Sequence, residues 1–333
     1  MSVSKAEELE LVEMMLLGSD AVDELATSEV GLAAAERAAR LAVAGSAVTG
    51  RVQVNGETSW MRILAGIVDD LDMLGYKEFH RVGKRVRYHI HLFQQSTGNP
   101  IGTVDGRRIT GLRTASTAAV AARHWADGRP LRLGLIGSGE EAKEGLRAFA
   151  GALDVTEAVV YSPTQANREA FAVGMQGETG VSVRPASAQQ DVLDSCEALY
   201  VATSSHHEPF LSADTLGTPR FIAAIGSTMP VHRELFGNVF LHARQVIIDT
   251  PDAAHESGDA IEAMDDGWDP NQAVLLGDYL DSRPLAPEAG MTLFKSIGSV
   301  EQDLVLARYL IDEAVAKGTG KIIEDVASLR MMR

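Results

Sequence analysis

The sequence predicts an α/β fold in which a doubly wound parallel sheet is inserted into an α+β domain. Three observations support this prediction. A glycine-rich turn joins an apolar strand to a helix near residue 137, apolar runs alternate with helical segments from there to about residue 300, and short alternating strands fill the region before it. We therefore expect the inserted domain at 126–300 and the surrounding domain at 1–125 and 301–333.

The composition is that of an ordinary globular chain, and it limits the classes of partner. The 333 residues are 45% hydrophobic, and their net charge of −16 argues against nucleic acid or an anionic membrane as a partner. No apolar run approaches the roughly 18–20 residues of a membrane span, and no basic region precedes an apolar one at the N-terminus. We therefore expect a cytoplasmic protein. The single cysteine, Cys196, excludes an internal disulfide and is expected to be buried and inert.

The first domain is expected to begin as helix and to continue as an antiparallel β region. Residues 5–45 are rich in Ala, Glu and Leu, with apolar residues three to four apart, which is typical of a helix. Residues 84–93 alternate between apolar and polar side chains, which is typical of a half-buried strand. Further strands are expected at 51–54, 60–63 and 101–105, with turns at 55–56 and 96–100. An Ala-rich helix is expected at 114–126.

The inserted domain is expected to alternate strands with helices. Several of its strands are near-continuous apolar runs, as in parallel strands that are covered on both faces. The expected strands are 131–136, 158–162, 181–184, 198–202, 221–225, 246–249 and 292–296. After them an amphipathic helix is expected at 301–317, ending at Gly318.

The glycine-rich turn carries the strongest functional signal. The run from Gly137 through Ser138, Gly139 and Glu140 to Ala142 matches G-x-G-x-x-A between a strand and a helix. Gly137 makes the tight turn, Gly139 lets a pyrophosphate approach the backbone, and Ala142 lets helix and strand pack closely. Because the helix N-terminus also favours negative charge, the motif predicts a Rossmann domain with a bound dinucleotide.

Several further blocks resemble the ornithine cyclodeaminase/mu-crystallin family. They occur in the family's order between about residues 45 and 325. The blocks are GYK at 75–77, GLRTAS at 111–116, GLIGSGEEA at 134–142, AIGSTMP at 224–230 with REL at 233–235, and LFKSIG at 293–298 with EQD at 301–303. The resemblance implies a homodimer, in which the N-terminal β region forms both the dimer contact and the substrate pocket. Its members include cyclodeaminases, alanine dehydrogenases and ketimine reductases.

The resemblance also implies which residues hold the substrate. The family binds the α-carboxylate of its substrate with three basic residues, which correspond here to Arg51, Lys77 and Arg113. A guanidinium matches a carboxylate with two charge-assisted hydrogen bonds. A lysine beside two arginines and out of water should have a lowered pKa, so Lys77 is also a candidate to exchange a proton. Arg62, beside the turn at 55–56, is expected either in the dimer core or at the substrate.

One residue departs from the cyclodeaminase pattern. Thr228 stands where true cyclodeaminases carry an aspartate that activates water, and a threonine cannot act as a general base near neutral pH. Glu78 and Asp249 are conceivable substitutes. The leading hypothesis is therefore an NAD(P)-dependent oxidoreductase acting on the C–N bond of an imino or α-amino acid. The alternatives are a cyclodeaminase with recycled NAD and a non-enzymatic, dinucleotide-loaded binding protein.

The second strand of the inserted domain bears on cofactor choice. It ends without the carboxylate that would bond a ribose 2′-hydroxyl in NAD. Ser162, Thr164 and Arg168 could instead receive a 2′-phosphate, which favours NADP(H) over NAD(H). Further cofactor contacts are expected from the family blocks and the loop at 203–204, namely Thr114, Thr203, Ser204, Lys295 and Ser296.

A metal site is not expected. No HExxH motif and no Cys/His set occur in the sequence. His89 and His91 fall on one face of their strand and are expected to face solvent.

Overall fold

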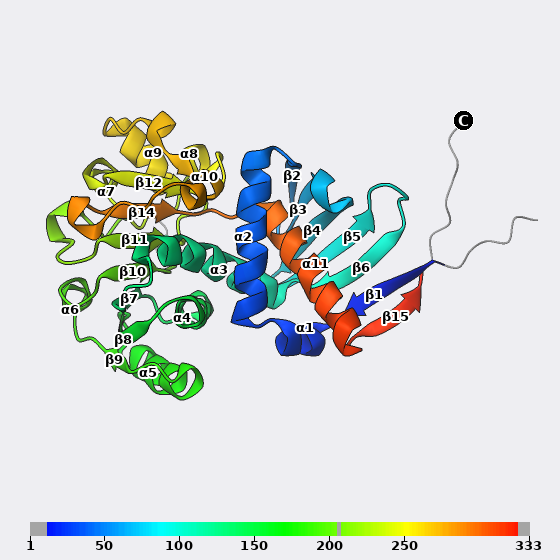
Figure 1. Cartoon of the computed structure of the whole chain (residues 1–333), viewed down its shortest axis with the longest axis horizontal. Coiled ribbons are helices and arrows are strands. Elements are labelled where there is room, and N and C mark those ends of the chain that lie inside the picture. The colour runs from blue at the N-terminus through cyan, green and yellow to red at the C-terminus, as the bar shows by residue number, and fades with distance from the viewer. Residues whose placement is uncertain (1–11, 205–207, 326–333) are drawn as a thin grey trace, which may run out of the picture.

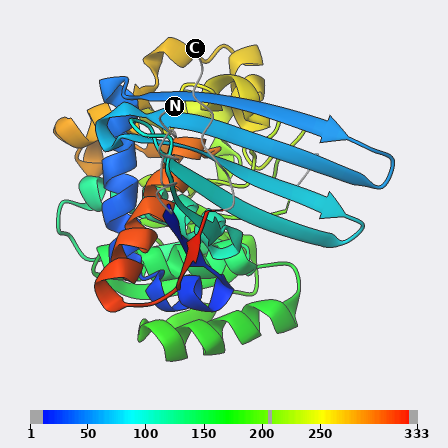
Figure 2. The same ribbon diagram turned by 90° about the vertical axis from the view of Figure 1, so that its right-hand side faces the viewer.

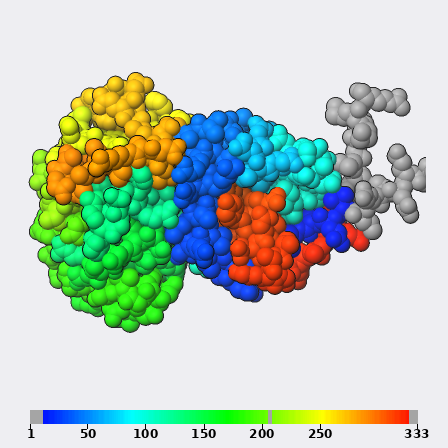
Figure 3. Space-filling model, in the orientation of Figure 1, coloured from blue at the N-terminus to red at the C-terminus, as the bar shows by residue number. Residues whose placement is uncertain are grey.

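The computed structural model describes residues 12–204 and 208–325 and contains two sheets. One sheet is built from strands near the two ends of the chain, and the other from strands in its middle. Helices α2 (Ser28–Ala44), α3 (Arg107–Ala126) and α11 (Val300–Lys317) lie between or against them (Figure 1). In the space-filling view the molecule has two lobes, with α2 and α11 on the surface where they meet (Figure 3).

The eight-stranded sheet is parallel throughout, as the sequence predicts. Its order is β13-β12-β14-β11-β10-β7-β8-β9, so β8 and β9 are added on one side of β7 and the later strands on the other, and the strand order reverses between β7 and β10. In sheets of this kind, ligands bind at the carboxyl ends of the strands beside such a reversal. The strands are β7 Leu131–Ile136, β8 Val155–Tyr161, β9 Val183–Pro185, β10 Ala198–Val201, β11 Phe221–Ala224, β12 Gln245–Ile248, β13 Val274–Leu275 and β14 Thr292–Lys295.

Helices cover both faces of this sheet, which explains why its strands are apolar on both sides. One apolar cluster joins the sheet to α2, α3, α4, α5 and α10, and the other joins it to α6, α7, α8 and α9. These further helices are α4 Glu140–Ala152, α5 Gln165–Thr179, α6 Gln189–Leu193, α7 Asn238–His242, α8 Ala253–Glu256, α9 Gly258–Asp265 and α10 Leu276–Asp281.

The seven-stranded sheet has the order β15-β1-β6-β5-β4-β3-β2. Five of its six pairings are antiparallel, the pairing of β1 with β6 being the parallel one, and the strands β2 to β5 extend beyond the helices as two long hairpins (Figure 2). The strands are β1 Glu13–Leu17, β2 Ala47–Asn55, β3 Ser59–Val68, β4 Met73–Val82, β5 Arg85–Gln94, β6 Pro100–Asp105 and β15 Lys321–Glu324.

Helix α11 packs on one face of this sheet. Gly66 and Gly75 lie opposite Leu304, and a side chain at either glycine would meet Leu304 methyl groups about 3.2 Å away. Side chains alternate along a strand, so every second residue from Gly66 and Gly75 lies on the same face of the sheet as these glycines. This face therefore also carries residues 62 and 64 of β3 and residues 77 and 79 of β4. That face leads into the space between the two lobes.

The expectation of helix from residue 5 to 45 was wrong in part. Residues 13–17 form β1, which pairs in parallel with β6 and antiparallel with β15. Helix occurs only at α1 (Ser19–Leu25) and α2, and residues 5–11 lie outside the described part of the chain. The Met and Leu side chains of β1 suit either structure locally, and the pairing with two strands decides it.

Candidate active site

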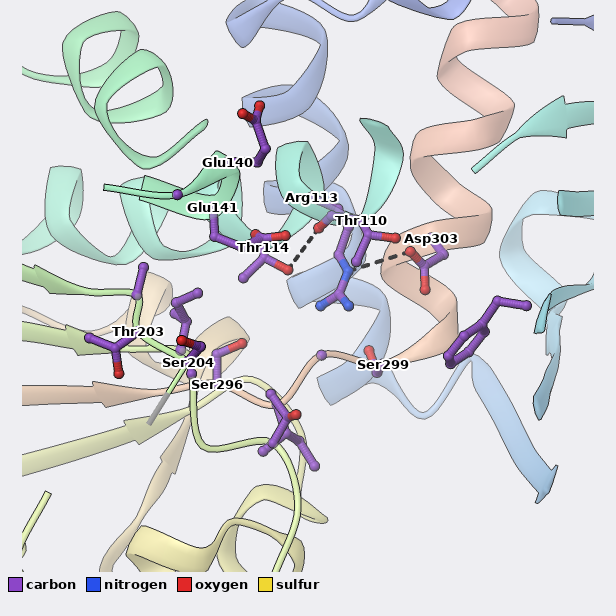
Figure 4. A pocket seen from close by; sticks show the side chains of 18 of the residues that line it. Thr110, Arg113, Thr114, Glu140, Glu141, Thr203, Ser204, Ser296, Ser299 and Asp303 are labelled. Atoms are coloured by element: carbon purple, nitrogen blue, oxygen red, sulfur yellow. Dashed lines mark hydrogen bonds and ion pairs between the residues drawn. The ribbon is translucent and has the colours of Figure 1, made fainter. Parts of the chain in front are cut away.

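A cavity of about 760 Å³ lies at the carboxyl ends of the parallel strands. Both lobes contribute its lining, with the inserted sheet on one side and β2, β3, β4, α3 and α11 on the other (Figure 4). Most of the expected site residues line it: Arg51, Lys77, Arg113, Thr114, Gly137, Ser138, Gly139, Glu140, Ser162, Thr203, Ser204, Thr228 and Ser296. Four others, Ala142, Thr164, Arg168 and Lys295, do not.

The glycine-rich turn has the geometry that a pyrophosphate requires. Gly137 adopts φ 117°, and a side chain there would overlap the carbonyl oxygen of Ala202. A Cβ at Gly139 would meet nothing within 4 Å, so the backbone is open to the cavity. Gly139 also caps α4 without a side-chain acceptor, which leaves the first N–H groups of the helix for an anion. Ala142 is fully buried beneath the turn, in its expected packing role.

The expected carboxylate site is built around a buried acid. Lys77 is only 2% exposed, and its Nζ donates to Thr110 Oγ1 and Asp303 Oδ1, both at 2.8 Å. The Nε of Arg113 lies 3.4 Å from the same Asp303 oxygen. Burial lowers the pKa of Lys77, and the positive charge of Arg113 adds to this effect, while Asp303 opposes it. Two cations thus share one carboxylate and keep a net positive charge for a ligand.

A second buried acid shapes the loop that follows β14. Asp249 accepts hydrogen bonds from Ser296 Oγ at 2.7 Å, from the backbone N–H of Gly298 at 2.8 Å and from Gln302 Nε2 at 3.2 Å. Gly298 adopts φ 78°, and a side chain there would overlap the guanidinium of Arg113. The glycine of the LFKSIG block therefore makes room for Arg113.

Arg51, the third basic residue expected at the substrate, forms ion pairs with residues of the other lobe. Arg51, on β2, forms an ion pair with Glu256 of α8, and its Nη2 lies 3.9 Å from Asp252 Oδ2. The pair links the two lobes at the mouth of the cavity. A substrate carboxylate at Arg51 would compete with Glu256.

Glu141 is a buried acid that sequence reasoning left without a role. Its Oε2 has no hydrogen-bond partner among the described residues, and it lines the cavity near Arg113 (Figure 4). Burial raises the pKa of the Glu141 carboxyl, an effect that the charge of Arg113 partly offsets.

The end of β8 carries the expected polar groups. Ser162 Oγ accepts a hydrogen bond from Ser138 Oγ at 2.8 Å. Arg168 Nη1 donates to the Ser162 carbonyl oxygen at 2.9 Å, and its guanidinium lies 5.7 Å from the Tyr161 ring centroid. Thr164 caps α5 next to Pro163, which lines the cavity. Thr164 and Arg168 thus border the cavity without lining it.

Lys295, expected beside the dinucleotide, is instead fully buried behind the sheet. Its Nζ lies 3.2 Å from Asp259 Oδ2 and donates to the Ala224 carbonyl oxygen at 3.2 Å. Nearby, Glu234 accepts hydrogen bonds from the Thr203 backbone and hydroxyl at 2.8 and 2.7 Å. Lys295 is buried because side chains alternate along β14, so that the side chain of Lys295 points away from the cavity while Ser296 lines it.

Thr228 lines the cavity and is exposed to it. Neither conceivable substitute for the missing aspartate lines the same space. Glu78 lies on the opposite face of its strand from Lys77, where it contacts His80 and His89. The carboxylate of Asp249 is taken up by the loop after β14.

The remaining titratable groups do not gather into a further site. Within 12–204 and 208–325, no three His, Cys, Asp or Glu side chains are placed to hold a metal ion. His89 and His91 are half-buried, His91 stacking on Tyr76 with ring centroids 4.7 Å apart. Cys196 is buried, as predicted, and burial raises the pKa of its thiol to about 12.

No helix in the described ranges has the length and apolarity needed to cross a membrane.

Three functional residues were missed by sequence reasoning. Thr110, Asp303 and Glu256 each contact an expected basic residue. The signal for Asp303 was present in the EQD block, because a buried lysine requires a buried acid nearby. For Thr110 and Glu256 the sequence offers no comparable signal, since their contacts depend on how the two lobes meet.

The sequence is similar to known proteins over most of its length. The model of the ornithine cyclodeaminase/mu-crystallin family matches residues 75–318. A Delta(1)-pyrroline-2-carboxylate reductase of Bacillus thuringiensis subsp. konkukian is 26% identical over 290 residues, or 83% of this chain and 88% of that protein.

Solved structures show the same fold. The Delta(1)-pyrroline-2-carboxylate reductase of Thermococcus litoralis, in complex with NADH and L-proline, superposes with a TM-score of 0.84 at 24% identity, covering 92% of this chain and 99% of that one. The iminosuccinate reductase of Paracoccus denitrificans, in complex with NAD+, gives a TM-score of 0.87 at 22% identity, covering 94% and 100%.

These relatives, together with a glycine-rich turn and a cationic pocket that open into one cavity, indicate an NAD(P)-dependent oxidoreductase. The α/β fold with an inserted parallel sheet is confirmed. The chain belongs to the ornithine cyclodeaminase/mu-crystallin family, whose model matches well over half of its length.

Proposed function

We propose that this protein reduces the C=N bond of an imino acid with NADPH or NADH, or catalyses the reverse oxidation of an α-amino acid. The observation that carries the proposal is the juxtaposition of Lys77 and Arg113 with the turn at 137–139 in one cavity. A bound reduced nicotinamide would supply a hydride. The protein would hold the α-carboxylate and thereby present the imine carbon in a fixed position.

Each basic residue has a distinct part in this proposal. Arg113 and Lys77 bind the carboxylate, and their shared partner Asp303 keeps them in place. Arg51 joins them once it leaves Glu256. The lowered pKa of Lys77 allows it to pass a proton to the substrate nitrogen, directly or through water.

Loss of absorbance at 340 nm tests the proposal. The substrates would be piperideine-2-carboxylate, pyrroline-2-carboxylate, and pyruvate with ammonia or methylamine, each with NADPH and with NADH. We expect turnover with at least one of them, and its loss in Arg113→Gln. Oxidation of neither cofactor by any substrate would overturn the proposal.

We further propose that NADP(H) is the preferred cofactor. The end of β8 offers Ser162, Thr164 and Arg168 and no carboxylate. Arg168→Gln should raise KM for NADPH about tenfold and leave KM for NADH nearly unchanged, because only NADPH carries the 2′-phosphate. Steady-state kinetics with both cofactors would check this. An equal effect on both would assign Arg168 a purely structural role.

A homodimer is also proposed, formed through the face of the seven-stranded sheet that points away from α11. Three valines on this face of β2 are exposed: Val48 at 63%, Val52 at 54% and Val54 at 64%. A contiguous apolar face of this kind is typical of a protein interface. Sedimentation should give the dimer mass, and Val52→Glu should give the monomer. Val173→Glu, at a valine on α5 that is 79% exposed, is the control.

Cyclodeamination remains an alternative with a defined test. The cavity presents Thr228, and neither Glu78 nor Asp249 lines it. We expect no ammonia release from ornithine by the wild type. Thr228→Asp should gain this activity if the missing carboxylate is the only obstacle. Ammonia release by the wild type without net cofactor change would favour the cyclodeaminase instead. A non-enzymatic binding protein would have no need for the buried Lys77 and Arg113.

A further inference from the structure

A fourth cation lines the cavity and differs from the other three. Arg62, on β3, is half-buried, and its Nε and Nη2 both donate to Gln53 Oε1, at 2.8 and 2.5 Å. Arg51, Lys77 and Arg113 each have a carboxylate partner. Within the described residues, Arg62 is the one lining cation without such a partner.

Without a carboxylate partner, the charged form of Arg62 is destabilised by its surroundings. Burial lowers the pKa of Arg62, and the nearby charge of Arg51 lowers it further. A partly desolvated guanidinium that meets only an amide oxygen retains most of its capacity to bind an anion. The cavity therefore holds a ready anion site in addition to the one at Lys77 and Arg113.

The two anion sites both adjoin one aromatic ring, Phe79, which pairs with Arg62 across the strands and lies two residues from Lys77 along β4. The Phe79 centroid is 5.8 Å from Lys77 Nζ and 5.7 Å from Arg62 Cζ. Along β3, position 64 pairs with Lys77 and with Arg51, and position 62 is the next residue on the same face. That step is about 7 Å along the strand. A short ligand lying along Phe79 would reach both sites.

We infer that the substrate is a dicarboxylic imino acid, whose α-carboxylate binds Lys77 and Arg113 and whose distal carboxylate binds Arg62. This inference rests on the proposed reduction of a C=N bond. In that step the reduced dinucleotide gives a hydride to the imine carbon, the nitrogen takes a proton from Lys77 or water, and an α-amino dicarboxylic acid and the oxidised dinucleotide result. Both carboxylates remain unchanged.

Matched substrates test the inference by kinetics. Ammonia would be combined with 2-oxoglutarate or with 2-oxopentanoate, and with oxaloacetate or with 2-oxobutyrate, so that each pair differs in the distal carboxylate. The wild type should favour a dicarboxylic imine at least about tenfold in kcat/KM. Arg62→Gln should abolish this preference, mainly through KM. Arg81→Gln, at an exposed arginine on β4 that does not line the cavity, should retain it.

Binding to the dinucleotide-loaded protein gives a readout without turnover. Calorimetry should show succinate or glutarate binding at least about tenfold more tightly than butyrate or valerate, and Arg62→Gln should remove the difference. Equal binding of both classes, or a difference that Arg62→Gln leaves intact, would overturn the inference. If monocarboxylic imines alone are reduced, the inference fails while the proposed function stands. If no imine is reduced, the proposed function fails, and the binding comparison still decides the role of Arg62.

Discussion

At the scale of single residues, the site depends on an imbalance of buried charge. Asp303 is fully buried and faces both Lys77 and Arg113, so one negative charge serves two positive ones. Burying ions is costly, and a shared partner reduces that cost without removing it. A bound carboxylate would complete the neutralisation, which is why this arrangement favours an anionic substrate.

Asp303→Asn should destabilise the protein by about 3 kcal/mol or more, because it leaves two buried cations without a counter-charge. Urea unfolding would measure the free energy of unfolding. The double variant Lys77→Met with Asp303→Leu is the control, since it removes both partners of the pair and should cost less than Asp303→Asn. A larger loss in the double variant would contradict this account.

The basic residues of the site could be predicted from the sequence, but their contact with Asp303 could not. Arg113 and Lys77 lie in family blocks, so the resemblance implied their role directly. Asp303 stands in the EQD block, but it lies 226 residues from Lys77 in the chain, and no local pattern pairs two residues at that separation. Arg62 was noticed, yet whether it faced the cavity or the outer face depended on strand register, which one residue of slippage would invert.

At the scale of elements, the loop from β14 to α11 positions Arg113. Gly298→Ala should lower kcat/KM about 100-fold, because the new methyl group would overlap the guanidinium of Arg113 and displace it from the substrate site. Gly180→Ala is a matched control: Gly180 also has a positive φ, at 73°, but a Cβ there meets nothing within 4 Å. It should cost about 1 kcal/mol of stability and leave kcat/KM unchanged. Equal kinetics for both variants would exclude the positioning role.

Elements with strong local signals were predictable, and those fixed by distant pairing were not. The strand at 131–136 was expected to the residue, with a glycine-rich turn and a helix after it, since turn chemistry and helix start coincide there. By contrast β4 was not expected, although it carries Lys77. Its sequence, MLGYKEFHRV, mixes charge and aromatic residues, and only the pairing with β3 and β5 makes it a strand.

At the scale of the whole molecule, a buried acid under the segments that follow β10 and β11 links stability to pH. Burial raises the pKa of Glu234 to about 7 in the folded protein, with Lys295 opposing the shift. Between its usual pKa and about 7, the folded state holds a proton that the unfolded state has lost. Raising the pH through this window therefore destabilises the fold, by up to about 1.4 kcal/mol per pH unit.

Comparison of the wild type with Glu234→Gln isolates this effect. The amide is neutral at every pH, so the wild type should lose stability relative to the variant as pH rises from about 5 to 7, with no further change above about 8. Urea unfolding at several pH values would measure both proteins. Parallel curves across this range would show that Glu234 does not titrate there.

The position of Asp303 also has a consequence for biosynthesis. The carboxylate site needs β4, α3 and α11, and α11 is made only after the whole inserted domain. Since domains fold as they leave the ribosome, the dinucleotide-binding half can be complete while Lys77 still lacks its partner. A nascent chain of this protein can thus carry a folded dinucleotide-binding half while Lys77 and Arg113 still lack the acid that holds them in place.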